Sequence, residues 1–289
     1  MNFKDKMRVA VGTAGTSLII GLDPVYEKIP AIIRRKAFSK ADAVTTFCRE
    51  IIEHTTPYCA GYKLNLAFFE ALGDQGLDVF GQVCSAIPFD KLLIADAKRG
   101  DIGNTTQMYA QAYMRKFRAD AVTLNPLMGI ETLLPFLKDS RRAVFALTLT
   151  SNPGAADFLL QKLENGRTLS EEIATRLQQL SEHDLALGTL GMVVGATQAE
   201  KLAPVLDLFP KAPLLIPGFG AQGGKVEELV SLLAARQHAA FPVVGRSIIY
   251  EFSDEDEHKW YKTVMLATKH FRKVFEPLKS NIEAFTQAD

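Results

Sequence analysis

The sequence predicts an α/β protein that folds as one (β/α)8 TIM barrel, and three observations support this. Eight short apolar runs recur along the 289 residues, and helix-like segments separate them. Each run is almost continuously apolar, which is typical of parallel strands covered on both faces. No linker rich in Pro or Ser divides the chain. Eight strands alternating with helices over this length fit one barrel better than two dinucleotide-binding halves.

The expected strands are residues 17–23, 59–65, 91–96, 121–126, 143–150, 191–196, 213–218 and 242–247. We expect one domain over residues 1–289, because the pattern continues without interruption from the first strand to the last. Between the fifth and sixth strands lies a long excursion at 151–189, and a helical segment at 254–289 closes the chain.

Helix starts are predicted from capping-box spacing, in which a hydroxyl residue precedes an acidic residue by three positions. Ser39 and Asp42 have this spacing ahead of an apolar stripe, and so do Thr197 and Glu200. A further helix is expected to begin at Ser170.

The charge balance gives no electrostatic sign of a nucleic-acid or membrane partner. Lys plus Arg and Asp plus Glu each number 33, so the formal net charge is zero. This favours neither nucleic acid nor an anionic membrane as a partner, and any anionic ligand must be held by local positive groups. No apolar run approaches the ~18 residues of a membrane span. Gly and Thr interrupt the N-terminal stretch "VAVGTAGTSLIIG", which we do not interpret as a signal peptide.

Cysteine and histidine usage indicates a reduced, cytoplasmic protein. The three cysteines (Cys48, Cys59 and Cys84) form no CxxC pair, and we expect small buried thiols. The five histidines are scattered without metal-ligand spacing, so we expect no His-based metal site. Carboxylates alone could still hold Mg²⁺.

Polar residues end most of the apolar runs, where a barrel carries its catalytic groups. They are Asp23, Lys63, Asn65, Asp96, Lys98, Asn125, Thr150, Ser151 and Arg246. By themselves, Asp23 ahead of Pro24 and the Asn-Pro-Gly turn after Ser151 are equally well explained as ordinary turns.

The segment "LLIADAKRGDIGNT" (92–105) carries the strongest indication of chemistry. Residues two apart on an extended strand point the same way, so Asp96 and Lys98 should both face the barrel mouth. Asp101 follows after Gly100, where the chain can turn freely, and Lys63 ends the neighbouring strand. The sequence predicts an alternating array of these four charged side chains. A solvated charge cluster in a loop is the alternative, and the preceding apolar run and the second lysine argue against it.

The segment "IPGFGAQGG" (216–224) contains a G-x-G-x-x-G pattern formed by Gly218, Gly220 and Gly223. A dinucleotide site is not favoured, because no acidic residue ends the following strand. That strand ends instead in Gly245 and Arg246. A glycine-rich turn after the seventh strand and a cation after the eighth match the phosphate site of many barrels. A tight turn with a surface arginine is the alternative.

Taken together, "GLDP", "YKLN", "DAKRGDIGNT", "TSNPGA", "PGFGAQGG" and "VGRS" resemble the orotidine 5′-phosphate decarboxylase family, and the longer bacterial-type members fit best. The resemblance spans residues 17–250. It implies conversion of orotidine 5′-phosphate to uridine 5′-phosphate (UMP) and CO₂, the last step of de novo pyrimidine synthesis, without metal or organic cofactor.

The resemblance also implies roles for individual residues. Lys98 matches the catalytic lysine that protonates C6 of the pyrimidine, Asp96 lies by the departing carboxylate, and Lys63 bridges the carboxylates and bonds a ribose hydroxyl. Asp101, Ile102 and Thr105 match residues contributed across the interface of a homodimer. The remaining substrate-binding residues are Asp23 (ribose), Ser151 (pyrimidine amide), and Pro217, Gln222, Gly223, Gly245 and Arg246 (phosphate end).

Two other functions fit part of the pattern. Mg²⁺-dependent enzymes of the same suite, keto-gulonate-phosphate decarboxylase and hexulose-phosphate synthase, keep D-x-K-x-x-D, but "KRGDIG" and "GAQGG" favour the orotidine enzyme. A non-catalytic barrel that binds a phosphorylated ligand is the other alternative. It is disfavoured because a pure binder gains nothing from clustered charges that are costly to desolvate.

Overall fold

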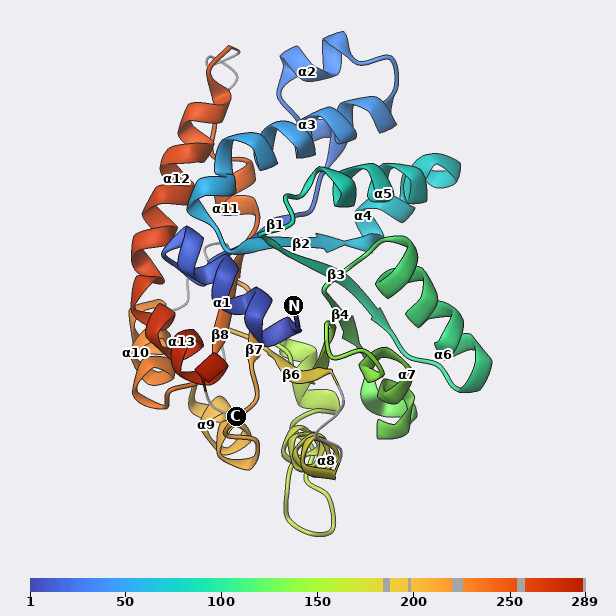
Figure 1. The fold of residues 1–289 in the computed structure, drawn as a ribbon, viewed down its shortest axis with the longest axis vertical. Helices are drawn as coiled ribbons and strands as arrows, with labels where there is room; N and C mark the ends of the chain where they lie inside the picture. Colours follow the sequence, from blue (N-terminus) through green and yellow to red (C-terminus); the bar gives the residue numbers. More distant parts are fainter. Residues whose placement is uncertain (184–187, 197–198, 220–225, 254–257, 288–289) are drawn as a thin grey trace.

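The eight predicted strands form a closed barrel of parallel strands in chain order, which confirms the (β/α)8 prediction (Figure 1). The computed structural model describes residues 1–183, 188–196, 199–219, 226–253 and 258–287. The strands are β1 (Ile19–Leu22), β2 (Gly61–Asn65), β3 (Leu92–Arg99), β4 (Ala121–Leu124), β5 (Ala143–Leu149), β6 (Thr189–Val194), β7 (Leu214–Pro217) and β8 (Ala240–Val244).

Helices surround the barrel and connect its strands. The α-helices are α1 (Phe3–Ala14), α2 (Ala31–Lys36), α3 (Lys40–Thr55), α4 (Leu66–Glu70), α5 (Gly76–Ala86), α6 (Gly103–Ala110), α7 (Leu134–Leu137), α8 (Leu169–His183), α9 (Ala199–Leu208), α10 (Val226–Ala235), α11 (Arg246–Ile249), α12 (Trp260–Val274) and α13 (Lys279–Gln287). Shorter turns are the 3-10 helices η1 (Tyr26–Lys28), η2 (Thr56–Tyr58), η3 (Gly73–Gln75), η5 (Pro126–Met128), η6 (Ile130–Leu133), η7 (Pro153–Asp157) and η9 (Glu276–Leu278), with a π-helical stretch η4 (Gln111–Lys116).

The bounds of all eight strands differ by one to three residues from their predictions, and two of these differences bear on the site. β3 continues to Arg99, three residues beyond the expected end, because a bulge carries the chain past the polar residues and back into pairing with β4. β8 ends at Val244 rather than at residue 247, because α11 already begins at Arg246. Arg246 is therefore the first residue of a helix rather than part of a strand.

The predicted capping box starts α3. The Ser39 hydroxyl accepts a hydrogen bond from the Asp42 backbone N–H (3.1 Å), and the Asp42 carboxylate accepts one from the Phe38 N–H (2.9 Å). These bonds satisfy backbone donors that the first turn of a helix leaves unpaired. Thr197 lies outside the described residues, as does the Glu200 side chain, so the capping box predicted there stays a prediction.

Helix α8 begins one residue earlier than expected, with a different cap. Thr168 and Glu171 form a reciprocal capping box, since each accepts a hydrogen bond from the other's backbone N–H (3.3 and 2.7 Å). The predicted start, Ser170, is buried and donates instead to the Leu159 carbonyl (2.9 Å). Because α8 leads back to β6, the second half of the predicted excursion is an ordinary strand–helix connection.

The barrel interior is closed at its N-terminal end by α1, which packs beside α13 near the two termini (Figure 1). Phe3, Met7 and Val11 of α1 are fully buried against strand residues such as Ile94 and Phe241. Each such side chain contributes about 1.5–3 kcal/mol through burial. With its N-terminal end plugged in this way, the barrel is left with its C-terminal end for chemistry.

A buried salt bridge joins helix α1 to the barrel. Lys6 Nζ lies 2.6 Å from Asp120 Oδ1, and the other carboxylate oxygen accepts a hydrogen bond from the Leu93 N–H (2.8 Å). Burial raises the pKa of Asp120 more than Lys6 and this hydrogen bond lower it. Asp120 directly precedes β4, so the pair lies at the end of the barrel opposite the polar strand ends.

The C-terminal helical segment covers the first helices of the barrel. Trp260 of α12 packs on Phe47 of α3 with ring centroids 5.5 Å apart, and Tyr261 stacks on His54 at 4.1 Å. In the part of the chain that the structure describes, no helix is both long and apolar enough to span a membrane. The three cysteines are buried and unpaired, as expected.

Candidate active site

Four charged side chains meet at the C-terminal ends of β1, β2 and β3, which are neighbours in the barrel (Figure 1). They are Asp23, Lys63, Asp96 and Lys98, and we refer to them as the charge cluster. Lys63 Nζ donates to Asp96 Oδ2 (2.6 Å), and Lys98 Nζ donates to Asp96 Oδ1 (2.5 Å). Lys63 Nζ also lies 3.6 Å from Asp23 Oδ1. The charges therefore alternate in sign along the cluster.

The charge cluster is buried at its centre and open at one end. The side chains of Lys63 and Asp96 are 5% and 7% exposed, whereas that of Lys98 is 46% exposed. Buried charges are tolerated only when each has a partner, and here each of them does. The ammonium of Lys98 is thus held by Asp96 while part of its side chain remains accessible from the barrel mouth.

The environment fixes the ionisation states of the two buried groups. Burial acts to raise the pKa of Asp96, but Lys63 and Lys98 outweigh it and hold that pKa well below its usual range. Burial acts to lower the pKa of Lys63, but Asp96 and Asp23 outweigh it and raise that pKa. At neutral pH, Asp96 is therefore a carboxylate and Lys63 an ammonium ion.

The bulge in β3 shapes the backbone under the cluster. Ala95 pairs with Val122 and Arg99 pairs with Leu124, so residues 96–98 of β3 stand opposite residue 123 alone. Lys98 adopts a left-handed backbone conformation (φ 47°), which is uncommon for a residue other than glycine. Such a bulge re-aims side chains next to it.

Thr123 occupies the gap opposite the bulge. Its hydroxyl donates to Asp96 Oδ1 (2.9 Å) and accepts a hydrogen bond from the Lys98 backbone N–H (3.1 Å). Sequence reasoning missed Thr123, whose only sign is a polar residue inside the apolar run "AVTL".

Asp101 does not join the charge cluster of its own chain, where Asp23 occupies the fourth place instead. Its carboxylate accepts a hydrogen bond from the following Ile102 N–H (2.8 Å), and no ion pair of Asp101 with a described cation is present. Ile102 is 57% exposed, and Thr105, in the first turn of α6, is also exposed. Among the described residues, none of these three side chains has a hydrogen bond or ion pair with the charge cluster.

The predicted phosphate residues lie after β7 and β8. Pro217 ends β7 and is partly exposed, and Gly218 follows with a φ of 110°, which favours glycine. Gly245 immediately precedes α11, and Arg246 is exposed at its first residue. Gln222 and Gly223 lie outside the described residues, so their placement stays a prediction.

Close packing of glycines brings the strand ends at the barrel mouth together. A Cβ on Gly21 would lie only 3.2 Å from the Gly245 Cα, and one on Gly245 would lie 3.8 Å from Asp23 Oδ2. Arg246 therefore follows a residue that borders the charge cluster. Across the mouth, Ser151 lies against Gly195, where a Cβ would come within 2.7 Å of the serine Cβ.

Tyr250, at the end of α11, ties the Arg246 segment to the first strand. Its hydroxyl donates to the Asp23 carbonyl (3.0 Å) and accepts a hydrogen bond from the Val25 N–H (2.6 Å). Its ring stacks on Phe47 at 5.9 Å. Burial raises the pKa of Tyr250 to about 12, so the hydroxyl remains a donor at physiological pH. Sequence reasoning missed this residue as well.

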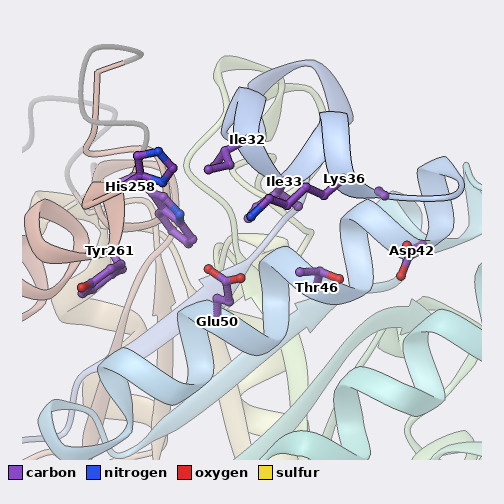
Figure 2. A pocket seen from close by; sticks show the side chains of 10 residues that line it. Ile32, Ile33, Lys36, Asp42, Thr46, Glu50, His258 and Tyr261 are labelled. Atoms are coloured by element: carbon purple, nitrogen blue, oxygen red, sulfur yellow. The ribbon is translucent and has the colours of Figure 1, made fainter.

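A separate hollow of about 210 Å³ lies between α2, α3 and the start of α12 (Figure 2). Its lining includes Ile33, Lys36, Glu50 and His258, and it shares no residue with the charge cluster. Burial raises the pKa of Glu50. The hollow lacks the paired, buried charges of the barrel mouth, so the charge cluster is the better candidate for catalysis. Within the described ranges, no three His, Cys, Asp or Glu side chains are grouped so that they could hold a metal ion.

Comparisons with known proteins converge on one family. The model of the orotidine 5′-phosphate decarboxylase / HUMPS family matches residues 16–259. Two bacterial relatives named orotidine 5′-phosphate decarboxylase are similar in sequence. The one from Dehalococcoides mccartyi is 38% identical over 95% of this chain and 100% of its own length. The one from Leptospira interrogans is 37% identical over 88% and 86%.

Solved structures agree with the sequence relatives. The structure of Leishmania donovani OMP decarboxylase has a TM-score of 0.78 and 30% identity, and the match covers 100% of both chains. A crystal structure of a protein from Toxoplasma gondii has a TM-score of 0.84 and 31% identity over 98% of each chain. Sequence and structure together place this chain in the orotidine 5′-phosphate decarboxylase / HUMPS family, to which it belongs.

Proposed function

We propose that this protein decarboxylates orotidine 5′-phosphate to UMP and CO₂, the last step of de novo pyrimidine synthesis. The observation that carries the proposal is the buried charge cluster, with alternating signs, at the C-terminal end of the barrel. The family description also covers the HUMPS enzymes, but the sequence relatives compared above are named orotidine 5′-phosphate decarboxylase, which favours this member.

The chemistry requires a charged site. Loss of CO₂ from C6 leaves a carbanion in the plane of the pyrimidine ring, which the ring π-system cannot delocalise. Its stabilisation must therefore come from preorganised charges. In this proposal the Lys98 ammonium lies beside C6, stabilises the developing negative charge and then donates a proton to it. The accessible side chain of Lys98 supports this role, because substrate can approach it from the barrel mouth.

Asp96 and Lys63 support Lys98 in different ways. Asp96 is ionised and holds the Lys98 ammonium at 2.5 Å, so the proton donor is aligned before substrate arrives. In this proposal the same carboxylate borders the departing carboxylate and disfavours the bound ground state. Lys63 bridges Asp23 and Asp96 and bonds a ribose hydroxyl, which keeps the buried charges balanced.

Asp23 and Ser151 bind the nucleoside in this proposal. Among the described residues, the buried Asp23 Oδ1 has no hydrogen-bond partner, although Lys63 Nζ lies 3.6 Å away, which leaves an acceptor for a ribose hydroxyl. Ser151, on the opposite side of the mouth, binds the pyrimidine amide.

The phosphate is bound at the ends of β7 and β8. Arg246, Gln222, and backbone N–H groups near Gly223 and Gly245 hold the dianion in this proposal, and Pro217 lines the approach. Binding energy gained at the phosphate can stabilise the reactive enzyme although the phosphate does not react. The exposure of Arg246 and its place at the start of α11 are compatible with an anion ligand.

We further propose a homodimer with shared active sites, in which Asp101, Ile102 and Thr105 act in the partner chain's site. Four exposed apolar side chains support an interface after β3 and β4: Ile102 (57%), Met108 (59%), Leu127 (60%) and Met128 (51%). The protein is proposed to be a single-domain cytoplasmic enzyme that needs no cofactor and binds neither nucleic acid nor membrane.

One assay tests the activity. Mixing the purified protein with orotidine 5′-phosphate should lower the ultraviolet absorbance as the substrate becomes UMP. The Lys98→Ala variant should lose this activity but still bind UMP, because Lys98 acts on the bond that breaks rather than on the product. An inactive wild-type protein would refute the assignment. A Lys98→Ala variant with more than about a tenth of wild-type activity would refute the role of Lys98.

The shared site has its own test. Lys98→Ala and Asp101→Ala should each be nearly inactive. When the two variants are unfolded and refolded together, about half of the dimers are mixed, and each mixed dimer has one site with neither defect. About a quarter of wild-type activity per site should return, on the same random pairing. If no activity returns although mass measurement confirms mixed dimers, both residues act within one chain.

A further inference from the structure

We propose that Thr123 is a positioning residue that sets both Asp96 and Lys98 for the decarboxylation. The inference deepens the proposed function and rests on it. Thr123 is 1% exposed, lies opposite the β3 bulge and touches both catalytic candidates through one hydroxyl group.

The two hydrogen bonds of Thr123 fix the direction of its proton. A hydroxyl has a single proton to donate, while its lone pairs can accept. The Lys98 N–H can only donate and the Asp96 carboxylate can only accept, so the Thr123 proton must point to Asp96 Oδ1. Oδ1 then receives this proton and the Lys98 ammonium, whereas Oδ2 receives Lys63. Each oxygen of Asp96 is thereby held in place.

The same hydroxyl compensates for the bulge. Because residues 96–98 stand opposite a single residue of β4, the Lys98 N–H meets a side chain there instead of a strand carbonyl. The bond to this N–H is partly buried, and leaving such a donor without a partner is costly, while the left-handed conformation of Lys98 adds strain. Thr123 satisfies this N–H and so stabilises the backbone from which the Lys98 side chain extends.

Other buried threonines lack this arrangement. Thr45 and Thr268, for example, each donate to the carbonyl four residues earlier in their own helix. Such bonds are local and tie no two strands together. Thr123 instead bonds a carboxylate and a backbone amide on the neighbouring strand, both at the charge cluster, which points to a role in the site.

The test compares Thr123→Val, which keeps the shape but removes the hydroxyl, with Thr123→Ser, which keeps the hydroxyl. The Thr268→Val variant is the matched control, because it removes a buried threonine hydroxyl far along the chain in α12. For each variant, kcat and KM for orotidine 5′-phosphate are measured, with kcat expressed per UMP-binding site so that unfolded protein does not count.

We expect Thr123→Val to lower kcat about 10- to 100-fold, the effect of losing hydrogen bonds to a charged group. KM should change by less than about threefold, because the groups that bind ribose and phosphate are untouched. Thr123→Ser and Thr268→Val should keep kcat within about threefold of wild type. Should Thr123→Val yield no folded protein, Thr123→Ala replaces it with the same expectation.

Two results would overturn the inference. A Thr123→Val enzyme with wild-type kcat would show that the hydroxyl does not position the site. A Thr123→Ser enzyme as slow as Thr123→Val would assign the effect to the lost methyl group and its packing. These outcomes are distinct from failure of the proposed function, in which the wild-type protein itself would not decarboxylate orotidine 5′-phosphate.

Discussion

Replacing Asp96 with asparagine removes the charge at the centre of the cluster and preserves the side-chain shape. Asp96 accepts hydrogen bonds from Lys63, Lys98 and Thr123 at 2.6, 2.5 and 2.9 Å. An asparagine presents an NH₂ group to one of these donors, so at least one ammonium loses its partner. In either orientation of the amide, the negative charge that holds both ammonium groups is gone, so Lys98 is held less firmly and we expect kcat to fall by about 1000-fold.

The cost in stability can be worked from the same contacts. Breaking a buried ion pair by removing one partner costs about 3–5 kcal/mol. Two features reduce this figure: the Lys98 side chain is 46% exposed and is solvated by water, and Lys63 keeps Asp23 at 3.6 Å. We therefore expect Asp96→Asn to lower the free energy of unfolding by about 2–3 kcal/mol at neutral pH.

The contribution of Asp96 to the free energy of unfolding should disappear in acid. The folded-state pKa of Asp96 is lowered from its ordinary value of 3.8, so its stabilisation is fully present above that value and is lost as the pH falls toward the folded-state pKa. The difference in unfolding free energy between wild type and Asp96→Asn should be constant from about pH 7 to 5. Below about pH 3.8 it should shrink by about 1.4 kcal/mol per pH unit.

Asp120→Asn is the matched control, since it removes another buried carboxylate that is paired with a lysine. Burial raises the pKa of Asp120, so its contribution is present below 3.8 and is lost as the pH rises through the folded-state pKa, opposite to Asp96. Because Asp120 lies at the other end of the barrel, kcat should stay within about threefold of wild type.

Urea unfolding at each pH and the absorbance assay measure both quantities. The reasoning is refuted if Asp96→Asn keeps more than about a tenth of the activity, or if its stability deficit persists unchanged in acid.

Three further predictions concern the periphery of the site. Arg246→Ala should weaken the binding of UMP by about 10- to 100-fold, because Arg246 meets the phosphate. The affinity for uridine, which lacks the phosphate, should stay within about threefold of wild type, and competitive inhibition constants measure both. Equal losses for the two ligands would make Arg246 structural. Activity should survive exhaustive chelation with EDTA, whereas an inactive protein restored by Mg²⁺ would move the assignment to the Mg²⁺-dependent enzymes of the suite. Tyr250→Phe should lower the free energy of unfolding by about 1–2 kcal/mol, because the partly buried Val25 N–H loses its acceptor. It should also raise KM, because the segment after β1 is held less firmly. Urea unfolding and steady-state kinetics measure the two effects, and an unchanged stability or KM would contradict the prediction.

The strands and the central pair of the site were predictable because their signals are local. Continuous apolar runs indicated all eight strands, and the D-x-K spacing predicted the contact of Asp96 with Lys98. The two residues meet on a bulge, however, and not on the regular extended strand that the prediction assumed. Helix α1 had no comparable signal, because residues 3–14 mix charges with small residues and only the closed barrel gives them an apolar surface to cover.

What could not be predicted depends on register between strands. The β3 bulge has no sequence mark, and without it there is no reason to single out Thr123 on β4. Asp101 looked like the fourth member of the array because it is near in sequence. Asp23 takes that place because β1 pairs directly with β2, which sets its end beside Lys63. Contacts of this kind arise only when the barrel closes.

The net charge of the charge cluster affects how a carboxylate substrate can bind. Two carboxylates and two ammonium groups sum to no net charge, so the cluster offers little net attraction to a carboxylate substrate. A partner chain's Asp101, if it joins as proposed, makes the site negative and opposes that carboxylate further. Binding free energy must then come from outside the cluster. We propose the Arg246 segment as its source, because it borders Asp23 through Gly245 and Tyr250. On this reasoning, the loss of phosphate contacts should lower kcat/KM by more than any change at the ribose, because only the phosphate end can offset the repulsion that the reaction relieves.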